Sequence, residues 1–450
     1  MIDIEVSTEY SGWAAARRAE LLNACAEALE AARPELVELA RAETRLGTER
    51  LEAELTRTTG QLRLLGEHVF AGGHLRPLSS PGAAPGGGDI VTVELAVGPV
   101  AVFGASNFPF AFGVAGGDTA SALAAGCPVV VKGHPAQPGL SRRIAALLAE
   151  AIEGAGAPKG TFTFVEGGPD VSIELVTHPS IKAVAFTGSP GGGRALMDAA
   201  AARPEPIPVY AEMGSVNPVF VLPGAARDLD WAQTLAGAVV GSAGQLCTKP
   251  GVIIAPDSAE GETLAQDVVA RINAAADQQM LTAPMATEHR RWQTQVEGSA
   301  TEGMAAGGTA AEGADYTVRP FAVIAPELEG EFAEEHFGPT TVLHLADPAT
   351  YTELASRLGG QLTATIIATP EDTDQVARLL PALAGIAGRI IYNGVPTGVA
   401  VTQAMIHGGP WPATSAPWST SVGTESVRRF LRPVALQNLP ADLLSALRPS

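Results

Sequence analysis

From Val91 onward, short strand-like runs alternate with helix-like runs, and this alternation restricts the fold more than any other feature. The strand-like runs are rich in Val, Ile and Phe; they include IVTVELAVGPVAVFGA, CPVVVK, GTFTFV and IKAVAFTGS. Amphipathic runs such as GLSRRIAALLAEAIEGAG and GGGRALMDAAAA separate them. Because parallel strands need a crossover helix between them, this order predicts a doubly wound parallel α/β sheet.

A second series with the same alternation runs from about Val219 to Asn393. Its strand-like runs are NPVFVLP, GVIIAP, TTVLHLA, TATIIATP and RIIYNG. A chain of 450 residues suits two or three domains. We therefore expect one domain from 1–74 and 98–218 with part of the C-terminal segment, and a second from 219–415. A small β element would combine a hairpin at 75–97 with a strand in about 430–450.

The segments outside the alternation have their own character. Residues 11–70 show helical spacing, with one helix-like run over 13–44 and a second after Gly47. The run LRPLSSPGAAPGGGDI is rich in Pro, Gly and Ser, which predicts an exposed loop or hairpin tip. Residues 296–315 are small and weakly patterned, which predicts a mobile surface segment.

Charge and cysteine content exclude several function classes. The net charge of −19 disfavours binding to nucleic acid phosphates. The N-terminus lacks the pattern of a signal peptide, and no run of 18 apolar residues suggests a membrane span. Three cysteines are too few for a disulfide framework, so we expect a reducing, cytoplasmic location.

One of these cysteines, Cys247, lies in the polar stretch AGQLCTKPG. It can be a buried filler, a redox thiol or a nucleophile. The nucleophile reading needs a lowered pKa or a nearby base. Gly244 and Gly251 would then let backbone amides approach a developing oxyanion. Cys25 and Cys127 lie in apolar runs and are expected to be buried fillers.

Two further residues suit chemistry at a carbonyl group. Glu212 ends a β-like run in VYAEMGS, and in an apolar setting its carboxylate can act as a general base. It can equally be a solvated strand-end carboxylate. Asn107, in FGASNFPFAFG, can donate from its side-chain amide to an oxyanion, or can serve an Asx turn.

Three more stretches suit a phosphate-bearing ligand or a turn. Lys132 ends a buried strand, where its ammonium suits a ribose or a phosphate. Ser189 and the glycines after it open a helix, which favours anions, although GSPGGG is not a dinucleotide fingerprint and can be a simple turn. The stretch FAEEHFGPTTVL can be a helix end broken by Gly-Pro.

The linear order of these motifs resembles that of the aldehyde dehydrogenase superfamily. The order is S-N-F-P, a strand-end Lys, F-T-G-S, E-M-G-S, G-Q-x-C and E-E-x-F-G-P, and the resemblance covers nearly the whole chain. The stretches RTTGQLRL, VVVKGHP, EMGSVNPVFV, GQLCTKPG and MIHGGPWPATS are similar to a bacterial branch. That branch includes α-ketoglutarate semialdehyde (2,5-dioxopentanoate) dehydrogenases and NADP-dependent fatty aldehyde dehydrogenases.

The resemblance implies a role for each motif. Cys247 would attack the aldehyde, Asn107 and the Cys247 N–H would hold the oxyanion, and Glu212 would activate the water that hydrolyses the thioester. The presence of Glu212 favours a free acid over transfer to CoA or phosphate. The residues implied to bind the nicotinamide cofactor are Lys132, Thr187, Gly188, Ser189, Gly193, Glu335 and Phe337.

Cofactor and substrate preferences follow from fewer residues. Pro135 stands where NAD-preferring relatives often carry a glutamate, which favours NADP over NAD, although Asp170 does not help a 2′-phosphate. Arg50 and Arg57 share one face of a helix and can hold the distal carboxylate of a semialdehyde, or can form surface salt bridges. Apolar walls are expected from Phe108, Phe110, Phe112 and Trp418.

The resemblance therefore predicts an NAD(P)-dependent aldehyde dehydrogenase that forms a carboxylic acid, with 2,5-dioxopentanoate as the expected substrate. Medium-chain, long-chain or aromatic aldehydes remain as alternatives, as does a non-catalytic protein that uses this fold. A homodimer or homotetramer is expected, with no metal ion, nucleic acid or membrane partner.

Overall fold

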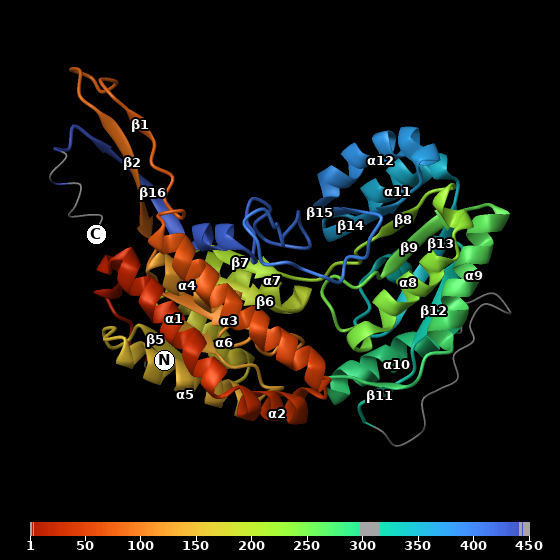
Figure 1. Cartoon of the computed structure of the whole chain (residues 1–450), viewed down its shortest axis with the longest axis horizontal. Coiled ribbons are helices and arrows are strands. Elements are labelled where there is room, and N and C mark those ends of the chain that lie inside the picture. Colours follow the sequence, from red (N-terminus) through yellow and green to blue (C-terminus); the bar gives the residue numbers. More distant parts are fainter. Residues whose placement is uncertain (1, 3, 298–314, 441–442, 444–450) are drawn as a thin grey trace. The chain divides into compact units, whose positions relative to one another are not determined.

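The computed structural model describes residues 2, 4–297, 315–440 and 443, and it divides into two compact units (Figure 1). The first unit comprises residues 1–212, 401–405 and 419–450, and the second comprises 213–400 and 406–418. The predicted α/β fold with two parallel sheets is confirmed. Much of the predicted segment 296–315 lies outside the described residues. Within the described part, no helix has the length and apolar character needed to cross a membrane.

The first unit is built on a parallel sheet of five strands in the order β5-β4-β3-β6-β7. These strands are β3 (Val100–Phe103), β4 (Val129–Lys132), β5 (Phe162–Val165), β6 (Ala183–Thr187) and β7 (Val209–Glu212). The helices are α1 (Ala15–Ala31), α2 (Arg33–Thr44), α3 (Thr48–Phe70), α4 (Gly117–Ala125), α5 (Pro138–Gly154), α6 (Pro169–Thr177) and α7 (Pro190–Ala201). Short Val-rich strands buried on both faces are typical of a parallel sheet.

The helical N-terminal region differs in one detail from the sequence prediction. The expected single helix over 13–44 is two helices, α1 and α2, which are separated at Ala32. Pro34 explains the break, because it occupies the first turn of α2 and cannot continue a helix from before it. Helix α3 packs along α1 (Figure 1).

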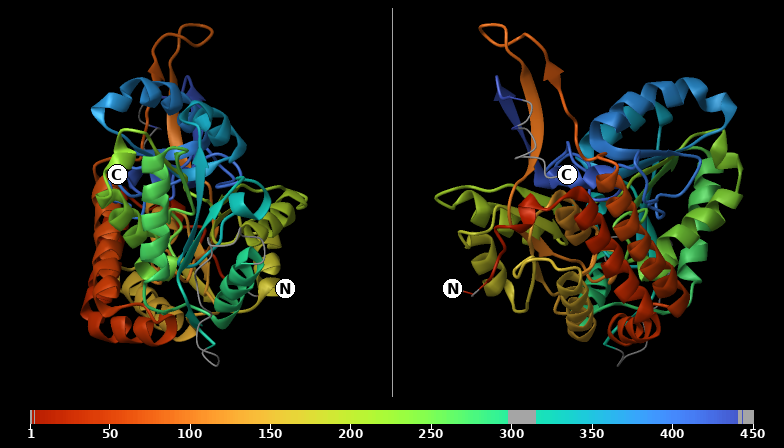
Figure 2. Two further views of the ribbon diagram at one scale, coloured as in Figure 1. Left: turned by 90° about the vertical axis from the view of Figure 1, so that its right-hand side faces the viewer. Right: turned by 60° about the vertical axis from the view of Figure 1, so that its left-hand side comes forward.

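A three-stranded antiparallel sheet projects from the first unit. Strand β2 (Ile90–Ala96) pairs with β1 (Ser79–Ser80) on one side and with β16 (Leu431–Gln437) on the other. Figure 2 shows this hairpin and β16 side by side, reaching beyond the helices of the unit. The chain near its C-terminus therefore pairs with the hairpin.

The second unit contains a parallel sheet of six strands in the order β12-β13-β9-β8-β14-β15. These are β8 (Val219–Val221), β9 (Val252–Pro256), β12 (Phe321–Ala325), β13 (Thr340–Ala346), β14 (Gln361–Ile367) and β15 (Ala387–Tyr392); β10 (Gln278–Gln279) and β11 (Thr317–Val318) form a separate pair. The helices are α8 (Asp230–Val240), α9 (Ala259–Asn273), α10 (Ala283–Glu297), α11 (Tyr351–Arg357) and α12 (Thr373–Ile386). Strand β12 was not among the runs that the sequence indicates.

Both faces of this second sheet are buried. In β8, Phe220 packs into one hydrophobic cluster, whereas Val219 and Val221 pack into the cluster on the opposite face. This division follows from the two-residue repeat of a strand. Helices α8 and α9 contribute residues to the second cluster, which packs them against this face of the sheet.

Candidate active site

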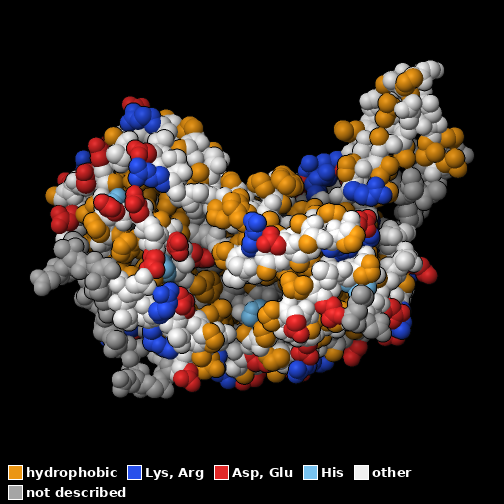
Figure 3. Space-filling model, turned by 180° about the vertical axis from the view of Figure 1, so that it is seen from behind, with side chains coloured by type: hydrophobic (Ala, Val, Ile, Leu, Met, Phe, Trp, Pro, Cys, Tyr) orange, Lys and Arg blue, Asp and Glu red, His pale blue; other side chains and the backbone are white. Residues whose placement is uncertain are grey.

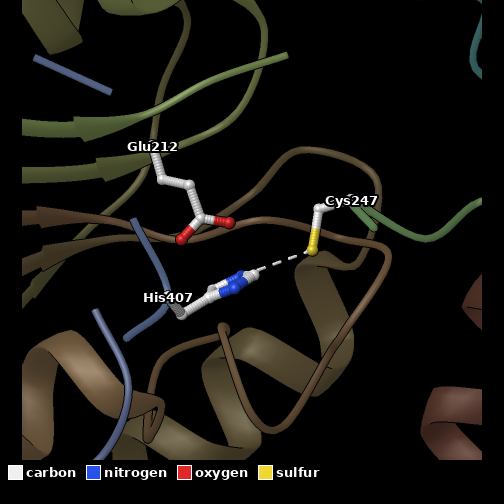
Figure 4. Close-up of side chains that lie close together, drawn as sticks. All are labelled: Glu212, Cys247 and His407. Carbon is white, nitrogen blue, oxygen red and sulfur yellow. Dashed lines mark hydrogen bonds between the residues drawn. The ribbon is translucent and has the colours of Figure 1, made fainter. Parts of the chain in front are cut away.

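Cys247 lies in the second unit, in the loop between α8 and β9. Its Sγ atom is 3.5 Å from Nε2 of His407, and the ring of His407 faces the sulfur (Figure 4). Cys247 is partly exposed, while His407 is 1% exposed. A partly exposed thiol beside an imidazole is the arrangement of an activated cysteine nucleophile.

The backbone just before Cys247 is strained. Ser242 and Ala243 have φ values of 55° and 54°, and Gly244 follows with φ of 62°. A residue with a side chain rarely adopts this left-handed region, and each such residue costs about 1–3 kcal/mol. Strain of this kind persists where the surrounding structure holds it, and it is concentrated at functional sites.

Asn217 is one of the residues that hold this loop. Its Nδ2 donates to the carbonyl oxygens of Cys247 at 2.9 Å and Lys249 at 3.0 Å. Asn217 itself has φ of 49° and is 1% exposed. The stretch EMGSVNP therefore fixes the carbonyl side of the cysteine loop through a side chain that the sequence did not single out.

The glycines around Cys247 serve loop packing. A Cβ at Gly244 would lie 1.9 Å from the carbonyl oxygen of Gly338, so these two loops touch through backbone. The Gly251 N–H donates to the Val216 carbonyl at 2.8 Å. The Gly251 amide is therefore already used within the fold, and the expectation that the two glycines let other backbone amides approach an oxyanion stays a prediction.

Lys249, which is buried, and Glu335, which is partly buried, interact electrostatically in the same unit. Lys249 is 3% exposed and donates from Nζ to the carbonyl oxygens of His336 at 2.9 Å and Thr340 at 2.6 Å. Burial raises the pKa of Glu335 to about 7, and the Lys249 charge opposes this shift. Burial likewise lowers the pKa of Lys249, while Glu335 opposes that shift. Lys249 thus links the cysteine loop to the loop that carries Glu335 and Phe337.

Glu212 ends β7 in the first unit and is 4% exposed. Its Oε2 accepts a hydrogen bond of 2.6 Å from the Ser421 hydroxyl. A second carboxylate of this unit, Asp118, is buried in an ion pair with Arg429 at 2.8 Å. Desolvation raises the pKa of Asp118, and the Glu212 charge adds to the rise although Arg429 opposes it. Glu212 is therefore a buried, oriented carboxylate rather than a solvated strand end.

Asn107 also lies in the first unit, in the loop between β3 and α4. Arg50 on α3 donates from Nη2 to the Asn107 carbonyl oxygen at 2.5 Å. Glu54, one turn later, accepts from the N–H groups of Phe110 at 2.8 Å and Ala111 at 3.0 Å through a single oxygen. Helix α3 therefore holds the Asn107 loop at two points.

The predicted cofactor residues of the first unit gather at one edge of its sheet. Lys132 and Thr187 end β4 and β6, which flank β3, and the carboxyl ends of parallel strands share an edge. Ser189 caps the N-terminus of α7, and its Oγ accepts from the Gly192 N–H at 3.2 Å. Among the described residues, the buried Oγ1 of Thr187 has no hydrogen-bond partner.

These features fit a dinucleotide. The open N-terminus of α7 suits a pyrophosphate, the orphaned hydroxyl of Thr187 offers it a donor, and the Lys132 ammonium suits a ribose or a phosphate. Burial lowers the pKa of Lys132, and the Asp170 carboxylate counteracts this. Glu335 and Phe337, the other two predicted cofactor residues, belong to the second unit.

The expected substrate residues have different environments. The guanidinium of Arg50 stacks on Phe108, with Cζ 4.9 Å from the ring centroid, and that of Arg57 lies 5.6 Å from the Phe112 centroid. The two phenylalanines contact each other edge to face at 5.7 Å.

Two of the residues expected to form apolar walls differ sharply in exposure. Phe110 is 0% exposed, so the expectation that it lines a substrate wall is wrong; its ring fills the core. Trp418 is 81% exposed. Its role at a substrate site stays a prediction.

The other two cysteines are buried, as expected of core fillers. Burial raises the pKa of Cys25 to about 12 and that of Cys127 to about 11. Neither thiol ionises readily near neutral pH, so Cys247 is the cysteine suited to nucleophilic chemistry.

Several residues that build this site carry no motif that points to them. His407, Ser421, Glu54 and Lys249 each act through a contact with a residue distant in sequence or through a backbone group. The stretches MIHGGPWPATS and GQLCTKPG contain His407 and Lys249, but neither stretch indicates which residue these side chains contact.

The chain is similar to known proteins over nearly its whole length. Residues 5–410 match the model of the aldehyde dehydrogenase family. The chain is similar to alpha-ketoglutaric semialdehyde dehydrogenase 2 of Azospirillum brasilense, with 43% identity over 97% of this chain and 85% of the relative. It is also similar to alpha-ketoglutaric semialdehyde dehydrogenase of Acinetobacter baylyi, with 41% identity over 95% of this chain and 83% of the relative.

A solved structure, the NAD-dependent aldehyde dehydrogenase from Sinorhizobium meliloti, has the same fold with a TM-score of 0.82. It is 21% identical, and the match covers 97% of this chain and 85% of that chain. The match to the family model spans most of the sequence, and the two relatives are similar along almost its full length. This chain belongs to the aldehyde dehydrogenase family, whose members are oxidoreductases that act on aldehydes with NAD(P).

Proposed function

We propose that this enzyme oxidises 2,5-dioxopentanoate, the semialdehyde of α-ketoglutarate, to 2-oxoglutarate with NADP. The observation that carries the substrate is the similarity, at 43% and 41% identity, to two relatives named for this semialdehyde. The overall reaction consumes the aldehyde, water and the oxidised cofactor. It yields the carboxylate, the reduced cofactor and two protons.

In the proposed first step, the Cys247 sulfur adds to the aldehyde carbon and its proton passes to His407. The separation of 3.5 Å between Sγ and Nε2 supports this transfer, because neutral imidazole accepts a proton near pH 7. Attack converts the carbonyl oxygen to an oxyanion in a thiohemiacetal. The side-chain amide of Asn107 and the backbone N–H of Cys247 then donate to that oxyanion.

The thiohemiacetal next loses hydride and becomes a thioester on Cys247. When bound, NAD(P) supplies the acceptor for this hydride. The residues assigned to hold it are Lys132, Thr187, Gly188, Ser189 and Gly193 in the first unit and Glu335 and Phe337 in the second. Lys132 would bind the ribose, Ser189 the pyrophosphate, and Glu335 the hydroxyls of the nicotinamide ribose.

Hydrolysis of the thioester completes the reaction. Glu212 takes a proton from water, the resulting hydroxide attacks the acyl carbon, and the thiolate of Cys247 leaves. Burial of Glu212 and its hydrogen bond from Ser421 at 2.6 Å support this role, because both orient the carboxylate. A dedicated water-activating base favours a free acid over an acyl group passed to CoA.

The distal carboxylate of the substrate is assigned to the arginines of α3. Arginine binds a carboxylate with two parallel hydrogen bonds, and stacking on Phe108 and Phe112 restricts the orientation of Arg50 and Arg57. Either Arg50, which also donates to the Asn107 carbonyl, or Arg57 is assigned as the carboxylate ligand.

Cofactor choice, assembly and compartment complete the proposal. NADP is preferred because Pro135 places no negative charge where a 2′-phosphate would lie, and NAD remains usable. The enzyme forms a homodimer or homotetramer through the projecting hairpin. A reducing compartment such as the cytoplasm keeps the Cys247 thiol active.

The test is a steady-state assay without CoA or phosphate, in which 2,5-dioxopentanoate, succinate semialdehyde and hexanal are each offered with NAD and with NADP. We expect the highest kcat/KM for 2,5-dioxopentanoate with NADP, and 2-oxoglutarate as the product by mass spectrometry. A clear preference for hexanal would contradict the assignment of a semialdehyde as the substrate. Strict dependence on CoA would exclude hydrolysis by Glu212.

A further inference from the structure

The loop that carries Asn107 is held by hydrogen bonds within it and by hydrogen bonds to helix α3. The Ala105 N–H donates to the Phe112 carbonyl at 2.9 Å, and the Phe112 N–H donates to the Phe108 carbonyl at 3.0 Å. These bonds close the loop at its base. The amides of Phe110 and Ala111, at the far side of the loop, donate instead to one oxygen of Glu54.

Burial of the Glu54 carboxylate is energetically unfavourable. It is 5% exposed, and its second oxygen, Oε2, is buried without a hydrogen-bond partner among the described residues. Burying a carboxylate costs several kcal/mol unless its partners compensate. The partners here are two consecutive backbone amides and the charges of Arg50 and Arg57 on the same helix.

Helix periodicity aligns these three side chains. Positions 50, 54 and 57 are four and three residues apart, so they share one face of α3. Arg50 bonds the Asn107 carbonyl, Glu54 bonds the Phe110 and Ala111 amides, and Arg57 stacks on Phe112. One face of α3 thus contacts the loop at Asn107, which bears the proposed oxyanion donor, and again at Phe110 and Ala111.

We propose that Glu54 is a positioning residue that fixes the Asn107 loop so that the Asn107 amide points at the developing oxyanion. The inference rests on the oxyanion role assigned to Asn107 above. Without the Glu54 acceptor, two buried amides lose their partner and the loop moves to satisfy them. An oxyanion donor is effective only when it is held in place before the reaction, so this movement slows thiohemiacetal formation.

The experiment measures the single-turnover rate of reduced-cofactor formation for variants at position 54, alone and combined with Asn107→Ala. Glu54→Leu removes the acceptor, whereas Glu54→Gln keeps a carbonyl oxygen that can accept from both amides. Glu52→Gln is the matched control, since Glu52 lies on the same helix and pairs with Arg33 at 2.8 Å instead. Circular dichroism and Tm verify folding of each variant.

We expect Glu54→Leu to slow the single turnover about 10- to 100-fold, as misplacement of a catalytic group does. Glu54→Gln and Glu52→Gln should retain the normal rate within about twofold, which is the usual limit of additivity. In the Asn107→Ala background, Glu54→Leu should add no more than about twofold, because the group that it positions is already gone. KM for the cofactor should change little.

Each other outcome is decisive. If Glu54→Leu slows the reaction by the same factor with and without the Asn107 side chain, Glu54 is a structural residue and the inference is wrong. A slow Asn107→Ala variant beside a normal Glu54→Leu variant also overturns it and leaves the oxyanion role intact. A normal Asn107→Ala variant overturns both. If Glu54→Leu does not fold, Arg50→Met tests the other contact with the loop by the same cycle.

Discussion

The Cys247 thiol and the His407 ring are neighbours that the chain brings together from 160 residues apart. Replacing His407 by Gln keeps a side chain of similar length but removes the proton acceptor. We expect the rate of Cys247 alkylation by iodoacetamide at pH 7 to fall about tenfold or more, and kcat to fall with it. The other cysteines are buried, so peptide mapping assigns the modified thiol. An unchanged alkylation rate would mean that His407 does not activate the sulfur.

The Asp170 carboxylate, which interacts electrostatically with Lys132, leads to a prediction about cofactor preference. Asp170 acts electrostatically on Lys132, so its carboxylate opposes a 2′-phosphate in the same region. Asp170→Asn removes that charge, and at an effective dielectric constant near that of water the gain is about 1 kcal/mol. The ratio of kcat/KM for NADP to that for NAD should rise about fivefold. Asp198→Asn, on exposed α7, is the control. A lower ratio for Asp170→Asn would contradict the assignment of this edge.

The pH dependence of cofactor affinity follows from Glu335. Burial raises its pKa to about 7, so the carboxylate gains a proton as the pH falls through about 7 and becomes a weaker hydrogen-bond acceptor for ribose hydroxyls. The dissociation constant of NADP should therefore rise as the pH falls from 8 to 6. The Glu335→Gln variant should bind NADP weakly, with a dissociation constant that is nearly independent of pH. Fluorescence titration of the bound cofactor measures both. A Glu335→Gln variant with the normal pH profile would exclude Glu335 as the titrating group.

The sequence points to the proposed reactive residues of this site more directly than to the residues that hold them. Cys247, Glu212 and Asn107 follow from residue chemistry and from the order of the motifs, because each must lie at a strand end or in a loop. Ser421 and His407 are an ordinary serine and histidine in the sequence. Only the fold makes Ser421 donate to Glu212 or places His407 beside the sulfur. Contacts over such separations leave no local pattern.

At the scale of elements, the loop between α8 and β9 depends on the absence of a side chain at Gly244. A Cβ there would lie 1.9 Å from the Gly338 carbonyl oxygen, and the backbone has φ of 62°. Gly244→Ala should lower the free energy of unfolding by about 2 kcal/mol or more and should reduce kcat, because the Cys247 loop must move. Denaturant unfolding measures the first effect.

Gly237 is the matched control for this variant. It lies inside α8, and a Cβ there would meet nothing within 4 Å. Gly237→Ala should raise the stability by about 0.5–1 kcal/mol and leave activity unchanged, because alanine favours a helix. Equal effects of the two substitutions would show that the close approach at Gly244 does not constrain the loop.

Element prediction succeeds where burial leaves a clear pattern. The short strands β3, β4 and β9 are buried at every position, so their sequences are apolar except for Lys132 at the end of β4. The sequence pattern does not indicate the break between α1 and α2, because the periodicity continues across Ala32 and only Pro34 interrupts it. Strand β12 is buried at all positions but Ile324, and it follows a weakly patterned segment that hides its start.

At the scale of the whole molecule, we predict that the projecting sheet of β1, β2 and β16 forms an interface between subunits. Figure 3 shows hydrophobic side chains gathered on this projection, and Leu78 is 69% exposed there. Exposed apolar surface on a protruding hairpin is typical of an interface between subunits. Leu78→Asp should weaken self-association at least tenfold, since burying a leucine contributes about 1.5–3 kcal/mol.

Light scattering during gel filtration gives the mass of each variant. Leu229→Asp, which changes an exposed leucine before α8, should keep the mass of the unmodified enzyme. A Leu78→Asp variant that keeps the mass at all concentrations would place the interface elsewhere.

The most direct measurement of the central claim is mass spectrometry of the Glu212→Gln variant after one turnover with 2,5-dioxopentanoate and NADP. Without its base, hydrolysis is slow, so the account predicts that a 2-oxoglutaryl thioester accumulates on the peptide that contains Cys247, together with one equivalent of reduced cofactor. The same experiment with Cys247→Ala should give neither product. An acyl group on Cys25 or Cys127, or reduced cofactor without any acylated cysteine, would contradict it.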